Sequence, residues 1–121
     1  MKQILIATQQ PDRLSPLSGR LDAQSHYTIA WADTAQKVFE AVSATPPKLT
    51  IIDERIDGKS GIAIAREVIM KNAMADIALV SSLSEEAFHE ASEGLGIVAQ
   101  LPPWPDETHA ERLIEVLATL P

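Results

Sequence analysis

The 121-residue sequence predicts an α/β protein in which five strands and five helices alternate along the chain. Short runs rich in β-branched residues, typical of strands covered on both faces, alternate with longer segments whose apolar residues recur at helical spacing. Apolar residues make up 45% of the chain, enough for a packed core. Strands that alternate with helices form a parallel sheet with right-handed crossovers, so we expect a single domain over residues 1–121.

The first strand is expected at residues 4–7, an apolar run too short for a signal peptide. A helix follows over about residues 14–23, where leucines recur at helical spacing and a proline stands in the first turn. Residues 27–31 form the second strand. The next helix begins after Asp33 or Thr34, either of which can cap it.

The remainder of the chain repeats this pattern, beginning with a strand at residues 49–52. The expected elements after it are a helix from Gly61 to about Asn72, a strand at residues 77–80, a helix capped by Ser82 or Ser84, a weak strand at residues 97–99 and a helix capped by Asp106.

Composition and charge exclude several classes of protein. The chain has no cysteine, which excludes disulfides and thiolate metal sites, and no apolar run long enough to span a bilayer. Residues 72–121 contain nine acids and a single basic residue, Arg112. An acidic half repels phosphate backbones, so we expect no nucleic-acid binding. Because the sequence has neither a membrane-spanning run nor a signal peptide, we expect no membrane partner and a cytoplasmic location. The acids form either a solvated face or a docking face for a basic partner.

Asp53 follows the apolar strand at residues 49–52 and precedes a loop with Gly58 and Gly61. This places a carboxylate at the carboxyl edge of a parallel sheet, where such sheets carry their chemistry. The order of elements, Asp53, the glycine eight residues later and Ser81 at the end of the fourth strand together resemble the receiver domain of two-component response regulators.

The resemblance implies a flavodoxin-like (βα)5 fold, a three-layer sandwich whose parallel five-stranded sheet has the order 2-1-3-4-5. It also implies that Asp53 is the phospho-acceptor candidate, with Ser81 and Ser82 as neighbours of the phosphoryl site. It implies signalling by phosphoryl transfer rather than an enzymatic activity on a metabolite.

The sequence departs from the receiver pattern at three places. Thr8 and Gln9 stand where receivers have two adjacent acids that bind Mg²⁺. Pro102 or Pro103, depending on the register, stands where they have a lysine. Ala99 or Gln100 replaces the aromatic switch residue of the fifth strand.

These departures predict a degenerate pseudo-receiver. Phosphoryl transfer depends on positive charge around the equatorial oxygens, and losing one such stabiliser costs roughly 3 kcal/mol of transition-state stabilisation. With the acid pocket and the lysine both changed, we expect no cofactor, and Mg²⁺ bound only weakly if Asp53 accepts a phosphoryl group at all. The alternative is a working phospho-acceptor receiver with an atypical acid pocket.

Asp53 itself allows three interpretations. Its carboxylate can accept backbone N–H groups or cap a turn, it can be a weak phosphosite, or it can pair with Arg55 in place of the missing cation. The last interpretation requires the strand to continue, because alternation then puts Arg55 on the same side. A displaced metal site of Asp53, Glu54 and Asp57 is a further, less favoured alternative.

Two other residues near this edge, Ser81 and Trp104, each allow two interpretations. Ser81 can be a phosphoryl ligand or simply a small residue fitting a tight strand end. Trp104, between prolines, can cover the end of the core or anchor an interface. The Pro102–Pro103 bond can be cis or trans.

The favoured function is a signalling module that acts by protein–protein contact, with a histidine kinase, an output domain or a second copy (a homodimer) as partner. The expected contact face combines the helix capped by Ser82 or Ser84, the strand at residues 97–99 and the helix capped by Asp106. Without the aromatic switch residue we expect one constitutive state. An unrelated nucleotide or flavin binder is disfavoured, because the loop after the first strand lacks a phosphate-cradling glycine. The chain can be a stand-alone regulator or a domain of a longer protein.

Overall fold

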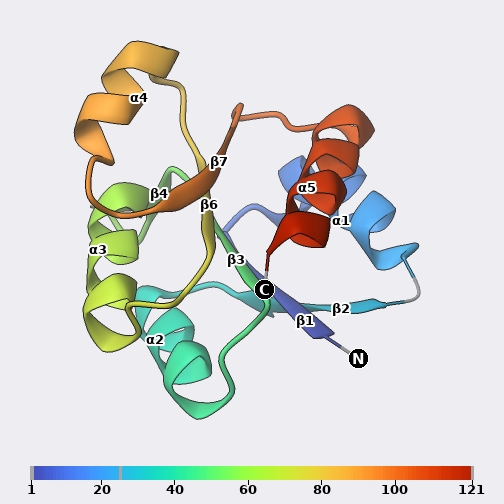
Figure 1. Cartoon of the computed structure of the whole chain (residues 1–121), viewed down its shortest axis with the longest axis horizontal. Helices are drawn as coiled ribbons and strands as arrows, with labels where there is room; N and C mark the ends of the chain where they lie inside the picture. Colours follow the sequence, from blue (N-terminus) through green and yellow to red (C-terminus); the bar gives the residue numbers. More distant parts are fainter. Residues whose placement is uncertain (1, 25, 121) are drawn as a thin grey trace.

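The computed structural model of the protein describes residues 2–24 and 26–120. Its centre is a sheet of five parallel strands in the order β2-β1-β3-β6-β7 (Figure 1). Apart from a separate two-stranded hairpin, this is the predicted 2-1-3-4-5 order, so the predicted fold is confirmed. The strands are β1 (Lys2–Ala7), β2 (Tyr27–Ala32), β3 (Leu49–Ile52), β6 (Ile77–Val80) and β7 (Ile97–Leu101).

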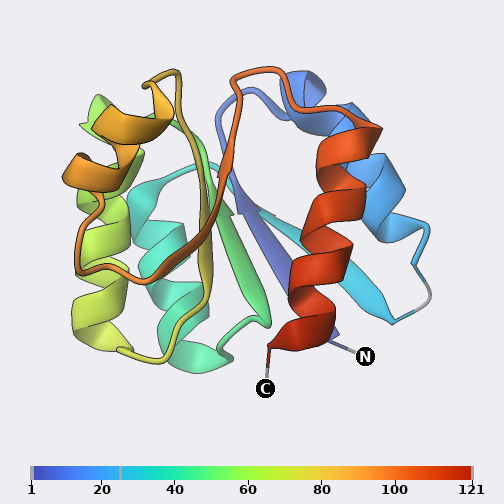
Figure 2. The same ribbon diagram turned by 45° about the horizontal axis from the view of Figure 1, so that its top comes forward.

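The helices cover both faces of this sheet and complete three layers (Figure 2). Helices α1 (Ser15–Asp22) and α5 (Glu107–Thr119) lie together on one face. The other face is covered by α2 (Ala35–Ala44), α3 (Gly61–Lys71) and α4 (Glu85–Ala91). None of the described helices has the length and apolar character needed to span a bilayer.

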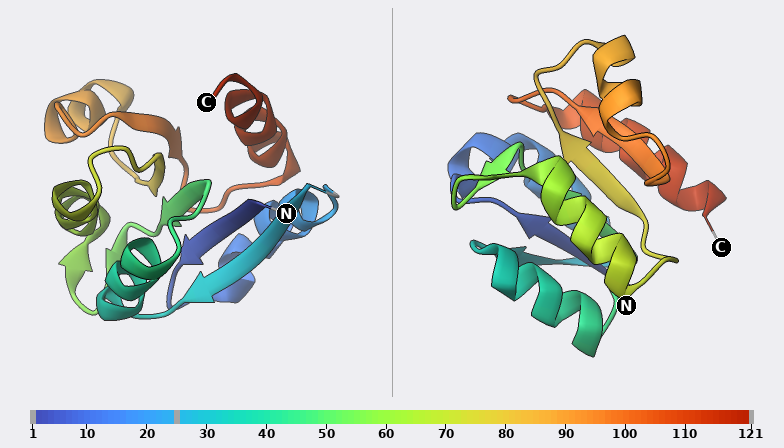
Figure 3. Two further views of the ribbon diagram at one scale, coloured as in Figure 1. Left: turned by 60° about the horizontal axis from the view of Figure 1, so that its bottom comes forward. Right: turned by 90° about the vertical axis from the view of Figure 1, so that its left-hand side faces the viewer.

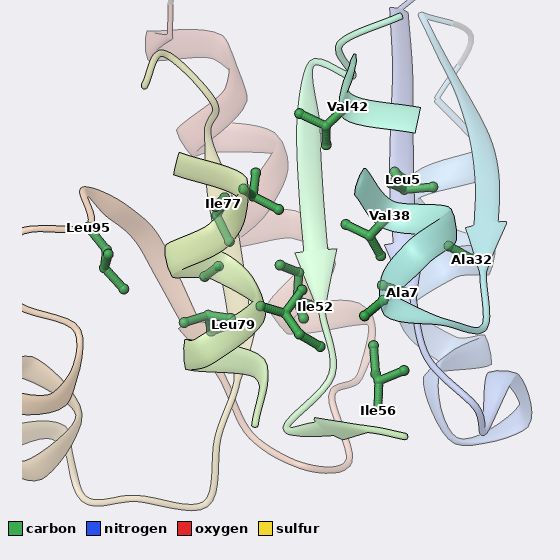
Figure 4. Packing of buried hydrophobic residues seen from close by; sticks show 14 of the residues in the cluster. Leu5, Ala7, Ala32, Val38, Val42, Ile52, Ile56, Ile77, Leu79 and Leu95 are labelled. Atoms are coloured by element: carbon green, nitrogen blue, oxygen red, sulfur yellow. The ribbon is translucent and has the colours of Figure 1, made fainter. Parts of the chain in front are cut away.

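Alternation along the strands divides the core into two clusters. In β1, Ile4 and Ile6 face α1 and α5, whereas Leu5 and Ala7 face α2 and α3. Figure 4 shows the cluster on the side of α2 and α3, in which Leu5 and Ala7 lie close to Val38 of α2. Every residue of β3 and β6 is buried, which explains why the central strands are uninterrupted apolar runs rather than alternating ones.

Side-chain caps start four of the five helices. Each capping oxygen accepts a backbone N–H of the first turn that has no partner inside the helix. At α5 the N–H of His109 donates to Asp106 and lowers the pKa of that carboxyl. The caps are Thr34 for α2, Ser60 for α3, Ser84 for α4 and Asp106 for α5.

Two segments differ from the sequence-based expectation. The first helix is preceded by a 3-10 turn, η1 (Pro11–Leu14), because Pro11 and Pro16 divide the helical segment. After β3 the chain forms a small antiparallel hairpin of β4 (Arg55–Ile56) and β5 (Lys59–Ser60). Its turn residues have φ of 53° and 76°, the left-handed region typical of such two-residue hairpins.

Gly61 sits where the hairpin returns to the sheet. Its N–H donates to the carbonyl of Glu54 at 2.8 Å, and a Cβ at this position would overlap with the carbonyl oxygen of Asp53. The glycine therefore allows α3 to begin directly beside the end of β3.

Replacing Gly61 by alanine should lower the free energy of unfolding by about 1–3 kcal/mol, because backbone rather than a mobile side chain must shift. The same change at Gly19, in the exposed part of α1 with nothing near the new methyl group, should raise it by up to about 1 kcal/mol. Urea unfolding of both variants measures the two values. Equal effects at the two glycines would contradict this account of the β3–α3 junction.

Candidate functional site

Asp53 stands at the carboxyl edge of the sheet, immediately after β3. Its N–H donates to the carbonyl of Ala7 at 2.9 Å, so the backbone still follows the sheet although the strand has ended. The loops that follow β1 and β7 meet above this edge (top of Figure 2). The parallel topology thus gathers segments that are far apart in the sequence around one buried carboxylate.

Arg13 of η1 is the cationic partner of Asp53. Its Nη2 forms an ion pair with Oδ2 of Asp53, and its Nη1 donates to the carbonyl oxygen of Pro103. Only 11% of the Arg13 side chain and 4% of the Asp53 side chain are exposed. The guanidinium carbon lies 6.0 Å from the centre of the Trp104 ring, a cation–π distance. One arginine therefore connects the loops after β1, β3 and β7.

The remaining bonds of the Asp53 carboxylate come from neighbouring residues. The hydroxyl of Thr8 donates to Oδ2 at 2.6 Å, and the N–H of Glu54 donates to Oδ1 at 2.7 Å. The Thr8 oxygen in turn accepts the N–H of Gln10 at 3.0 Å. Both carboxylate oxygens are thus hydrogen-bonded, and among the described residues no buried side-chain polar atom lacks a partner.

Of the three interpretations of Asp53, the ion pair with Arg55 is wrong in its partner, because Arg13 pairs with Asp53 instead. Strand β3 ends at Ile52 and the chain turns into the hairpin, so the alternation that would have aligned Arg55 with Asp53 is interrupted. Arg55 is exposed, and its Nη2 donates to the carbonyl of Gly58 at 2.9 Å. The role of Arg13 could have been predicted from the strand order, because Arg13 closely follows β1 and β1 is the neighbour of β3.

The displaced metal site is contradicted by the geometry of its three acids. Glu54 Oε2 accepts both the N–H and the hydroxyl of Ser82 at 2.7 Å each. Asp57 Oδ1 accepts from the Gln9 amide at 2.6 Å, and the N–H of Asp57 donates back to Gln9 at 3.2 Å. Each acid, Asp53 included, therefore serves a different partner, and no cluster of three ligating side chains occurs in the part of the chain that the structure describes.

The serine at the end of β6 is engaged locally. The buried hydroxyl of Ser81 accepts the N–H of Leu83 at 3.1 Å, as a small residue in a strand-end turn would. From the neighbouring strand, the amide of Gln100 donates to the carbonyl of Leu83 at 2.9 Å. Ser81 and Gln100 therefore both hold the loop between β6 and α4.

The loop after β7 rules out one of the two interpretations of Trp104. Trp104 is 74% exposed, so it does not cover the end of the core; its ring lies beside the guanidinium of Arg13. No peptide bond of the described residues is cis, so the Pro102–Pro103 bond is trans. Pro103 contributes its carbonyl oxygen, not a positive charge, to the site.

A small cleft of about 230 Å³ opens above the ion pair. It contains two cations and two carboxylates, whose charges balance. Mg²⁺ prefers several oxygen ligands in octahedral geometry, but the oxygens of Asp53 already serve Arg13, Thr8 and Glu54. The residues present therefore do not fit a Mg²⁺ site. The lining residues are Gln10, Arg13, Asp53, Glu54, Arg55 and Pro103.

Comparison with protein-family models gives no match, and comparison with curated protein sequences gives no similar protein. Solved structures are nevertheless similar over nearly the whole chain. A CheY-like receiver domain protein from Methanospirillum hungatei has 17% identity and a TM-score of 0.82, covering 98% of this chain and 94% of its own. The chain has the receiver-domain fold.

Two further structures support this assignment. The receiver domain of NtrX from Brucella abortus is 18% identical with a TM-score of 0.80, covering 96% of this chain and 98% of its own. A LuxR-family two-component response regulator from Aurantimonas is 18% identical with a TM-score of 0.82, covering 98% and 86%. At this level of identity the likeness concerns the receiver fold alone.

Replacing Arg13 by methionine should lower the free energy of unfolding by about 3 kcal/mol, because it leaves the buried Asp53 carboxylate without its cation. Adding Asp53→Asn should recover part of this loss, because the amide removes the unpaired charge. Chemical denaturation of the two single variants and the double variant gives the coupling energy between the residues.

The matched control is Arg20→Met, which removes a partly exposed arginine whose Nε lies 3.8 Å from Oε1 of Glu111. This solvent-accessible pair should contribute less than about 1 kcal/mol. An Arg13→Met variant no less stable than Arg20→Met, or a double variant whose losses simply add, would contradict a buried ion pair at this position.

Proposed function

We propose that this protein is a receiver-like domain of two-component signalling that acts by protein–protein contact in one constitutive state, without efficient Mg²⁺-dependent phosphorylation of Asp53. The observation that carries the proposal is the buried ion pair between Arg13 and Asp53. It supplies the positive charge that the carboxylate needs, and it does so from within the chain.

The ion pair works against phosphoryl transfer. To accept a phosphoryl group, an Asp53 oxygen must give up its hydrogen bonds and attack phosphorus, while other cations neutralise the equatorial oxygens. Here Arg13 and Thr8 hold Oδ2, and the N–H of Glu54 holds Oδ1. Losing one electrostatic stabiliser typically costs roughly 3 kcal/mol in the transition state, and this site lacks both the acid pocket and the lysine.

The loop between β6 and α4 supports a single state. Its carbonyl at Leu83 accepts from Gln100, its Ser82 is held twice by Glu54, and Ser81 closes the turn. A ligand shifts an equilibrium only if it prefers one of two populated states. We therefore propose that the protein signals through the partner that binds to it, not through a rearrangement of this loop.

The proposed docking face consists of α4, β7 and α5. It carries a cleft of about 410 Å³ between α4 and β7. Helix α4 has Glu85, Glu86 and Glu90 and no lysine or arginine, so the face suits a partner with basic side chains, such as the basic surface of a histidine kinase or an output domain. The cleft is lined by Glu85, Phe88, His89, Ile97, Val98, Ala99, Gln100 and Arg112.

A second candidate function is a phospho-acceptor receiver with an atypical site. It is favoured by one observation, the identity of the cation, because a guanidinium binds phosphate oxygens as well as carboxylates. In that case Arg13 would move from the carboxylate of Asp53 to the transferred phosphoryl group.

Phosphorylation separates the two functions. Incubated with Mg²⁺ and a small acyl phosphate or phosphoramidate donor, the wild-type protein should show no phosphoryl adduct by intact-protein mass spectrometry, because Asp53 is held by Arg13. A phosphorylation-competent receiver serves as positive control and Asp53→Asn as negative control. A stoichiometric adduct that is absent from Asp53→Asn would overturn the proposal and establish the second candidate.

Metal binding gives an independent readout. The chain has two tryptophans, so a Trp31→Phe variant leaves Trp104 beside Arg13 as the one tryptophan, whose emission can be excited selectively. Millimolar Mg²⁺ should leave its emission unchanged. A saturable change that disappears in Asp53→Asn would show that the carboxylate binds the metal after all.

The docking face predicts that charge reversal there abolishes partner binding. A Glu86→Lys, Glu90→Lys bait should lose the proteins that wild type retains at low salt, because both side chains are exposed on α4. The matched control is Glu40→Lys on α2, an exposed acid on another helix. Quantitative affinity capture compares the three baits, and equal retention by all of them would contradict the assignment of this face.

A further inference from the structure

The outer edge of β2 is an uncharged strand edge. In the described part of the chain, no strand pairs with β2 on the side away from β1. Its six residues, Tyr27–Ala32, include no charge and no proline, which are the devices that usually protect an edge strand. This edge is therefore a template for pairing with another strand.

The backbone bonds show which groups face outward. The carbonyls of His26 and Ala32 accept the N–H groups of Lys2 and Thr8, at 3.1 and 2.9 Å. Successive residues of a strand point their backbone groups to opposite sides, so the even-numbered residues bond to β1. The N–H and C=O groups of Ile29 and Trp31 consequently point away from the sheet.

Side chains beside this edge form a knob and a hollow. Trp31 is 45% exposed, which is unusual for a tryptophan in a strand. Next to it lies a hollow of about 210 Å³, shared with α1 and open above Gly19, where an added Cβ would have no neighbour within 4 Å. Figure 3 (left) shows β2 at the border of the sheet, beside α1. The hollow is lined by Ser18, Gly19, Asp22, Ile29 and Trp31.

We propose that the occupant of this edge is a second copy of the chain, paired antiparallel through β2 about a twofold axis at Ala30. In this register Ile29 of one copy lies opposite Trp31 of the other, and both residues expose their backbone groups to the junction. The indole of one copy covers Ile29 of the other and enters the hollow beside Gly19. Symmetry makes the same contact twice, as in any isologous interface.

The distribution of charge favours self-association here over the acidic face. Strand β2 carries no charge, and the acids and bases of the adjoining helices are equal in number, whereas α4 and α5 have an excess of acids. Two copies that meet at β2 keep their acidic edges apart, but two copies that meet at β7 bring like charges together. The adjoining charged residues are Arg20 and Asp22 of α1 and Lys37 and Glu40 of α2.

This inference does not depend on the proposed signalling role, because β2 and β7 are opposite edges of the sheet. Pairing of one short strand from each copy buries less surface than a standard interface, so we expect a reversible dimer with a dissociation constant of roughly micromolar or weaker.

Sedimentation equilibrium tests the dimer. Wild type should show a reversible monomer–dimer equilibrium, and Trp31→Lys should weaken it at least about tenfold, because it puts a charge at the centre of the junction and removes the indole. The matched control is Met70→Lys, which likewise replaces an uncharged side chain by lysine. Met70 lies on α3 and is 81% exposed, so this variant should dimerise like wild type. A monomeric wild type, or a dimer that Trp31→Lys leaves unchanged, would overturn the proposal.

Amide hydrogen exchange locates the interface. The N–H groups of Ile29 and Trp31 should become more protected as the protein concentration rises, while those of Thr28 and Ala30, which face β1, should be protected throughout. Protection that rises instead in α4 or β7 would place the dimer on the acidic face and contradict the assignment to β2. Protection at Ile29 and Trp31 that does not change with concentration would contradict self-pairing altogether.

Discussion

The ion pair between Arg13 and Asp53 is the interaction on which the carboxyl edge of this sheet depends. A carboxylate buried at the end of a central strand is costly unless a cation and hydrogen-bond donors compensate it. Arg13 supplies the cation, Thr8 and the N–H of Glu54 supply the donors, and the carbonyl of Pro103 takes the other side of the guanidinium. The loops after β1, β3 and β7 are consequently held together by one side chain.

The polar residues around this pair hydrogen-bond to one another. Gln9 bonds in both directions with Asp57, Glu54 holds Ser82, and Gln100 holds the carbonyl of Leu83. Gln9 and Gln100 thus make structural contacts between neighbouring loops. Buried side-chain polar atoms in the described part of the chain accordingly all have hydrogen-bond partners.

The two edges of the sheet differ in charge and thus in the partners that suit them. The β7 edge lies beside α4 and α5, where acids are in excess. The β2 edge lies between charge-balanced helices and presents Trp31 and unpaired backbone groups. Electrostatic complementarity suits the first to a basic protein, whereas hydrogen bonding and apolar contact suit the second to a strand from an identical chain.

The sequence by itself determined the fold and the placement of Asp53 directly after β3, because alternating apolar runs, caps and Gly61 act locally and specify each element and the residue that ends it. It also showed that Thr8, Gln9 and two prolines stand at positions where the resemblance to receivers predicts acids and a lysine. Tertiary structure alone decided that Arg13, not Arg55, pairs with Asp53 and that Trp104 is exposed. These contacts join loops 40 residues or more apart, and the unpredicted β4–β5 hairpin redirects Arg55, so only the assembled sheet fixes which side chains meet.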